Sequence, residues 1–111
     1  MILRVEGDPL GVELVEPERF DELKLSVPHG CGAAEAARVL GPGVDVNDDS
    51  HLRVPARAVA LLAGAAPGWC DRFRAMLRAV EPMGWYDAAT DTIRVHLEAQ
   101  PSGRRRWTTW L

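Results

Sequence analysis

The sequence predicts an α+β fold: a mostly antiparallel sheet of five to seven short strands with about three helices packed on one face. Three observations lead to this prediction. Several segments alternate apolar and polar residues, as half-buried strands do. Other segments have the composition or apolar spacing of helices, and clusters of Gly, Pro, Asn and Asp separate them. The 111 residues are 47% hydrophobic and 26% charged, which is typical of a globular domain with its own core.

The first quarter of the chain predicts three strands. Residues 2–6 and 12–16 alternate, and the intervening Gly7-Asp8-Pro9-Leu10-Gly11 supplies turn residues, so we expect a hairpin. Residues 17–22 begin with Pro and are rich in acids, which indicates one helical turn. Residues 23–27 alternate again and form the third expected strand.

The middle of the chain predicts a helix, a short hairpin and a second helix. Residues 33–40 are rich in Ala and end at Gly-Pro, as short helices do. Residues 44–54 place two apolar pairs around Asn-Asp-Asp-Ser, which favours a tight turn between two strands. Residues 55–63 begin with Pro and stop before a glycine, so a helix is expected there.

Residues 67–97 form the clearest structural unit. A helix is predicted over 69–81, because the large apolar residues fall on one of its faces: Trp69, Phe73, Met76, Leu77 and Val80. Pro and Gly then end the helix, and strands are expected at 85–87 and 92–98. Alternation along the last strand turns three residues toward the core: Ile93, Val95 and Leu97.

We expect a single domain over residues 1–102, followed by an Arg- and Trp-rich C-terminal tail over residues 103–111. Docking of Trp107 and Trp110 on the domain, or on a neighbouring subunit, would bury their apolar surface. Arginines mixed with aromatic residues can also bind single-stranded nucleic acid. The net charge of −3 argues against a dedicated nucleic-acid protein.

Composition also bears on origin and location. Arg outnumbers Lys twelve to one, which indicates a high-GC bacterial genome. The chain has only two cysteines, no signal peptide and no apolar run long enough to span a membrane. We therefore expect a cytoplasmic protein with no membrane partner.

Charge is unevenly distributed along the chain. The first 52 residues carry eleven acids and four bases, whereas the other 59 carry five acids and nine bases. Either the two halves interleave and their charges meet across the surface, or an acidic and a basic face serve partners. The second interpretation, together with the tail, predicts a homodimer.

The best candidate for catalysis is the loop His29-Gly30-Cys31-Gly32, which precedes the expected helix over 33–40. A thiolate at a helix start has a lowered pKa, and His29 is close enough in sequence to assist it. The same loop could bind an anion through its backbone N–H groups, or Cys31 could be a small core residue. If the protein is an enzyme, we expect a lyase, isomerase or transferase whose pocket is served by His29, Cys31 and His51.

We expect no metal and no cofactor. The acidic loop over 45–51 alternates oxygen ligands as in the first half of a calcium loop, but Ser50 stands where Gly is needed. Ala56 stands where a bidentate Glu is needed. The three histidines do not have the spacing of a zinc motif.

The outward side of the last hairpin is the predicted recognition surface. Trp85 and Tyr86 are neighbours on a strand, so one of them faces away from the core. Arg94 and His96 lie on the outward side of the next strand, and aromatic residues with Arg are typical of protein interfaces.

The sequence therefore favours a small non-catalytic accessory protein, of the regulatory or immunity type, that binds a protein partner or associates with itself. The enzyme and a nucleic-acid binder that uses the tail are the alternatives. A small-molecule ligand would also suit the outward face.

Overall fold

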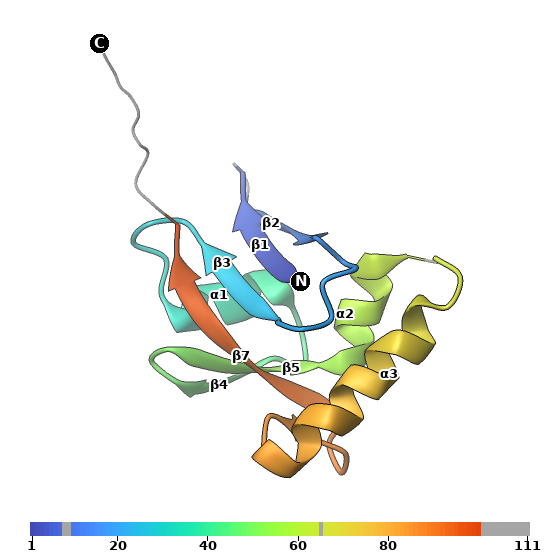
Figure 1. Cartoon of the computed structure of the whole chain (residues 1–111). Helices are drawn as coiled ribbons and strands as arrows, with labels where there is room; N and C mark the ends of the chain where they lie inside the picture. Colours follow the sequence, from blue (N-terminus) through green and yellow to red (C-terminus); the bar gives the residue numbers. More distant parts are fainter. Residues whose placement is uncertain (8–9, 65, 101–111) are drawn as a thin grey trace.

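In the computed structural model, which describes residues 1–7, 10–64 and 66–100, the chain forms an open mixed sheet with three α-helices (Figure 1). The predicted α+β class with a mostly antiparallel sheet is confirmed. Within these ranges, no helix is long and apolar enough to cross a membrane. The expected docking of Trp107 and Trp110 falls outside the described residues.

The elements follow the expected order closely. The strands are β1 (Ile2–Glu6), β2 (Gly11–Val15), β3 (Lys24–Val27), β4 (Asp45–Asp48), β5 (His51–Pro55), β6 (Tyr86–Asp87) and β7 (Thr92–Ala99). The helices are α1 (Ala33–Leu40), α2 (Ala56–Ala63) and α3 (Trp69–Val80), and the 3-10 helix Glu81–Met83 follows α3. The hairpins β1–β2, β4–β5 and β6–β7 are all antiparallel pairs, as expected.

β7 is the central strand although it is the last one described. The order across the sheet is β2-β1-β3-β7-β5-β4. On one side of β7, β6 pairs with Thr92 and Ile93, and β3 pairs with the residues from His96 onward. Arg94 and Val95 therefore lie between the two partner strands on that side. The candidate functional site lies at this gap between β6 and β3 along the edge of β7.

The two faces of the sheet differ in chemistry. Alternation sends the apolar residues of β1, β3, β5 and β7 to one face, against which α1 and α2 pack (Figure 1). α3 lies beside α2 and adds Trp69, Phe73 and Leu77 to the same core. The opposite face, here called the outer face, carries the alternate, polar residues of the central strands: Lys24, His51, Arg53, Arg94, His96 and Glu98.

The prediction of a helical turn over residues 17–22 is wrong, because this segment forms non-helical turns. Six residues are too few to hold a helix without tertiary support. Here the tertiary contacts favour another conformation, since the indole Nε1 of Trp69 donates a 2.7 Å hydrogen bond to the carbonyl of Pro17. Phe20 from the same segment packs against the Trp69 ring, with 5.7 Å between the ring centroids.

Candidate functional site

A hollow of about 450 Å³ lies on the outer face beside β7. It lies where β6 and β3 leave part of β7 without a strand partner on that side. A smaller cavity of about 60 Å³ shares Asp21, Glu22, Leu23, Trp85 and Arg94 with it and adds the apolar residues Phe20, Met76, Val80 and Ile93. We call the larger space the outer-face hollow; its lining residues are Asp21, Glu22, Leu23, Lys24, His51, Trp85, Arg94, His96 and Glu98.

Two arginines lie side by side at this position. Arg53 of β5 and Arg94 of β7 are direct partners across the sheet, so their side chains leave the same face. Arg53 Nη2 donates one long hydrogen bond, of 3.5 Å, to the carbonyl of Gly84. Within residues 1–7, 10–64 and 66–100, neither guanidinium forms an ion pair, and the buried atoms Arg53 Nη1 and Arg94 Nε have no hydrogen-bond partner. The structure thus holds two adjacent positive charges without a counter-ion.

Two histidines occupy the next row of the same face. His51 and His96 are also direct strand partners, and their rings meet edge to face with 5.1 Å between centroids. His51 Nδ1 lies 2.9 Å from Asp48 Oδ1. This hydrogen bond, and one from the backbone N–H of Ser50, hold the pKa of Asp48 well below its usual value. Because an ionised carboxylate can only accept, the Nδ1 atom of His51 carries the proton in this contact.

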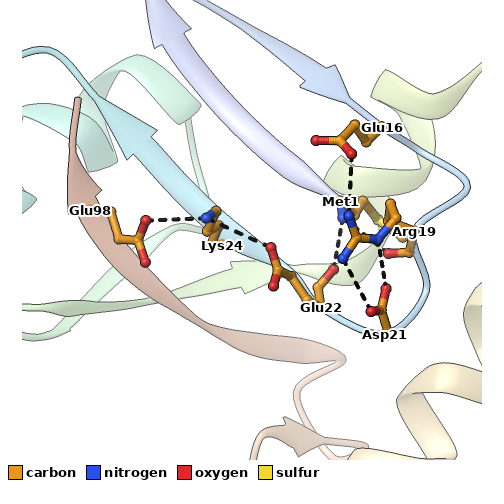
Figure 2. A network of polar contacts seen from close by, with 7 residues as sticks. All are labelled: Met1, Glu16, Arg19, Asp21, Glu22, Lys24 and Glu98. Atoms are coloured by element: carbon orange, nitrogen blue, oxygen red, sulfur yellow. Dashed lines mark hydrogen bonds and ion pairs between the residues drawn. The ribbon is translucent and has the colours of Figure 1, made fainter. Parts of the chain in front are cut away.

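The rim of the hollow formed by segment 19–24 and Glu98 consists of paired charges, as Figure 2 shows. Lys24 Nζ lies 3.3 Å from Glu98 Oε1 and 3.7 Å from Glu22 Oε1. The hydrogen bond to Glu98, together with the charges of both glutamates, raises the pKa of Lys24. The positive charge of Lys24 is therefore already compensated.

The outer part of this rim is held together by a side-chain ion pair and by hydrogen bonds from the N-terminal ammonium group to backbone carbonyls. Arg19 Nε donates a 3.0 Å hydrogen bond to Asp21 Oδ1. The Met1 ammonium group donates to the carbonyls of Arg19 and Glu22, at 3.0 and 2.9 Å (Figure 2). These contacts fix the segment 19–24 beside the hollow. Among the described lining residues, Arg94 is the cation without an ion pair, and Arg53 lies directly beside it on β5.

Three of the four domain residues predicted for recognition line the hollow: Trp85, Arg94 and His96. Trp85 is 48% exposed, and its carbonyl accepts a 2.7 Å hydrogen bond from the backbone N–H of Arg94. Tyr86 points elsewhere and lines a cavity of about 240 Å³ between α2 and α3. The other two predicted residues, Trp107 and Trp110, lie outside the described residues.

The three residues proposed for catalysis do not come together. His51 is level with His96 and Lys24 in the sheet, whereas His29 follows the far end of β3, about five residues or roughly 16 Å further along. Burial, and then the neighbouring Glu35, raise the pKa of the Cys31 thiol, which disfavours the nucleophilic thiolate. Among the described residues, no three His, Cys, Asp or Glu side chains are placed to share a metal ion.

Arg53 is the residue of the site that sequence reasoning missed. A signal was present, because His51-Leu52-Arg53-Val54 repeats in reverse the polar and apolar order of Ile93-Arg94-Val95-His96. Antiparallel pairing of such segments brings Arg to Arg and His to His. The match predicts a strand pair only when the two strands are known to be neighbours, and the sequence alone does not give the strand order.

Tyr86 offers a direct check of the local geometry. Its hydroxyl donates a 2.5 Å hydrogen bond to Asp91 Oδ1, which raises the pKa of Tyr86 to about 12. The chain contains one tyrosine, so we expect its tyrosinate absorbance to titrate near pH 12. Asp91→Asn should shift the midpoint toward the ordinary value of 10.0, and Asp87→Asn should not.

The stability that this contact contributes is present below pH 10 and is lost as the pH rises through the raised pKa. A midpoint near 10 in the unaltered protein would contradict the contact.

Comparison of the chain with protein-family models, with curated proteins and with solved structures gives no match.

Proposed function

We propose that the protein is a small non-catalytic interaction protein that recognises an acidic segment of a partner protein through the outer-face hollow. The observation that carries this proposal is the pair of uncompensated arginines, Arg53 and Arg94, beside the exposed ring of Trp85. Arg and Trp are the residues that most often contribute large shares of binding energy at protein interfaces.

The charges support an acidic ligand. Like charges directly opposite on neighbouring strands destabilise a sheet, and part of each guanidinium is out of reach of water. A carboxylate or another oxyanion at this point would remove both costs, because Arg forms its strongest hydrogen bonds with such groups. The rim acids are already engaged by Arg19 and Lys24.

Support for the enzyme alternative is weaker. It relied on His51 lying near His29 and Cys31, which follow the far end of β3, and on a reactive Cys31 thiol, whose pKa is raised. Cys31 and Cys70 are both free thiols, which agrees with the bacterial cytoplasm that we propose as the protein's location.

We expect the unaltered protein to bind a subset of short peptides in which Asp, Glu or a phosphorylated residue adjoins an aromatic one. Fluorescence anisotropy at low salt would measure this. Arg94→Gln should weaken the binding roughly tenfold or more, since it removes a charge-assisted contact. The matched control is Arg72→Gln on α3, whose guanidinium pairs with Glu18 at 2.9 Å.

The proposal fails if no acidic peptide binds, or if the Arg94→Gln and Arg72→Gln proteins bind equally well. Matched peptides with Asn or Gln in place of the acid should not bind. Added salt should weaken the interaction, because charge pairs at the surface are screened.

A further inference from the structure

We infer that, if the outer-face hollow is the recognition site proposed above, its preferred ligand is a phosphate monoester dianion on an aromatic group. The phosphate would lie over Arg53 and Arg94, and the aromatic group would lie against Trp85. Three features of the hollow favour this ligand: its arginine pair, its hydrogen-bond donors and its apolar end.

The charge favours a dianion. Arg53 and Arg94 are adjacent guanidinium groups, and the structure gives neither an acidic partner within the described ranges. One carboxylate carries a single negative charge and compensates one arginine. A phosphate monoester carries about −1.5 to −2 near neutral pH and compensates both. Clustered arginines are also how proteins commonly read phosphorylated segments.

The donors are spread over an area that suits three oxygens. Arg53 and Arg94 belong to adjacent strands, and His51 and His96 form the next row about two residues along. The guanidinium donors of Arg53 and Arg94 therefore come from two adjacent strands on the same face of the sheet. A carboxylate has two oxygens in one plane, whereas the three terminal oxygens of a phosphate monoester accept from several directions.

The end of the hollow next to Trp85 is apolar. The adjoining cavity of about 60 Å³ is lined there by Met76, Val80 and Ile93. The Trp85 ring is about half exposed, and a flat ring stacked on it would gain aromatic contact. Asp21, Glu22 and Glu98 also line the hollow, and Asp21 and Glu22 line the small cavity beside Trp85 as well. Because carboxylates repel a phosphate, they favour its placement over Arg53 and Arg94.

Isothermal titration of the full chain at low salt would test the inference with three probes: phenyl phosphate, benzoate and inorganic phosphate. Phenyl phosphate should bind about tenfold or more tightly than benzoate, because it adds a second charge-assisted contact. Arg53→Gln and Arg94→Gln should each weaken phenyl phosphate about tenfold or more, whereas Arg72→Gln should not. Circular dichroism would show that each variant is folded.

Trp85→Ala tests the contact of the aromatic group separately from the contact of the phosphate. It should weaken phenyl phosphate about three- to tenfold and leave inorganic phosphate unchanged, since only the former reaches the ring. Equal loss for both probes would overturn the placement of the aromatic group. Equal affinity for benzoate and phenyl phosphate would overturn the preference for a dianion.

Two further ligands identify the source of the phosphate. A short peptide containing phosphotyrosine represents a modified partner protein, and adenosine monophosphate represents a free nucleotide. Tighter binding of either one than of phenyl phosphate supports the inference and names the source. No binding of any phosphate probe overturns it.

The failures of the two proposals can be told apart. If carboxylate peptides bind in an Arg94-dependent way and phosphate probes do not, the interaction function stands and the phosphate inference is wrong. If phenyl phosphate binds and no peptide does, the ligand class is right and the protein partner is wrong.

Discussion

Trp69→Ala is expected to destabilise the protein by about 4 kcal/mol, in the range for large-to-small replacements of buried aromatic residues. The side chain is 1% exposed. Its ring stacks on Phe73, with centroids 4.7 Å apart, and packs against Phe20. Because its indole also binds the carbonyl of Pro17, the replacement releases the segment that holds one wall of the outer-face hollow.

Urea unfolding followed by far-UV circular dichroism would measure this loss, since the chain has three other tryptophans that complicate fluorescence. Trp69→Phe should cost less, about 1–3 kcal/mol, because it keeps a ring but leaves the Pro17 carbonyl without its donor. The control is Leu61→Ala on α2, where the side chain is 81% exposed and a change within about 0.5 kcal/mol is expected. A Trp69→Ala protein as stable as the Leu61→Ala protein would refute the role of Trp69.

Replacing Arg94 with Met should have the opposite effect and raise the free energy of unfolding by about 1 kcal/mol. Methionine keeps much of the side-chain volume while it removes a like-charge contact with Arg53 and an unpartnered buried N–H group. Arg53→Met should act similarly. The double variant should gain less than the sum, because either single change already relieves the repulsion.

Arg72→Met is the matched comparison for this experiment. Arg72 pairs with Glu18 and its guanidinium lies 4.5 Å from the centroid of the Phe20 ring, so its loss should lower stability slightly. Chemical denaturation at low and moderate salt would measure all four variants. A lower stability for Arg94→Met than for the unaltered protein would show that the arginine pair is stabilising, and the argument from uncompensated charge would fail.

Together these expectations describe two arginines, Arg53 and Arg94, that lower the free energy of unfolding of the unliganded protein and provide contacts to the ligand. Residues that destabilise the unliganded fold are retained where function requires them. If Arg94→Met gains stability and loses the acidic ligand, both results have one physical cause, the pair of charges on neighbouring strands.

The sequence predicted those parts of the site that depend on local periodicity. Alternation alone placed Arg94 and His96 on the outward side of the last hairpin and required either Trp85 or Tyr86 to face away from the core. Arg94, His96 and Trp85 line the hollow. The helix over 69–81 was correct for the same reason, since its buried residues Trp69 and Phe73 repeat with the helical period.

What the sequence could not show was which strands are neighbours. Arg53 and His51 join the site only because β5 pairs with β7, a contact between residues about 40 positions apart. His29 and Cys31 were grouped with His51 by chemical type, but β3 runs parallel to β7 and carries them to its far end. The pairing of the strands therefore determined both which residues join the site and which predicted residues lie away from it.

The late position of β7 in the chain has a consequence for folding. The pairs that build the hollow join residues far apart in sequence, such as Lys24 and His96, separated by 72 positions. The hairpins β1–β2 and β4–β5 can close early because their loops are short. The outer-face hollow cannot form until β7 inserts between β3 and β5. During synthesis on the ribosome, both hairpins can therefore close before the hollow exists.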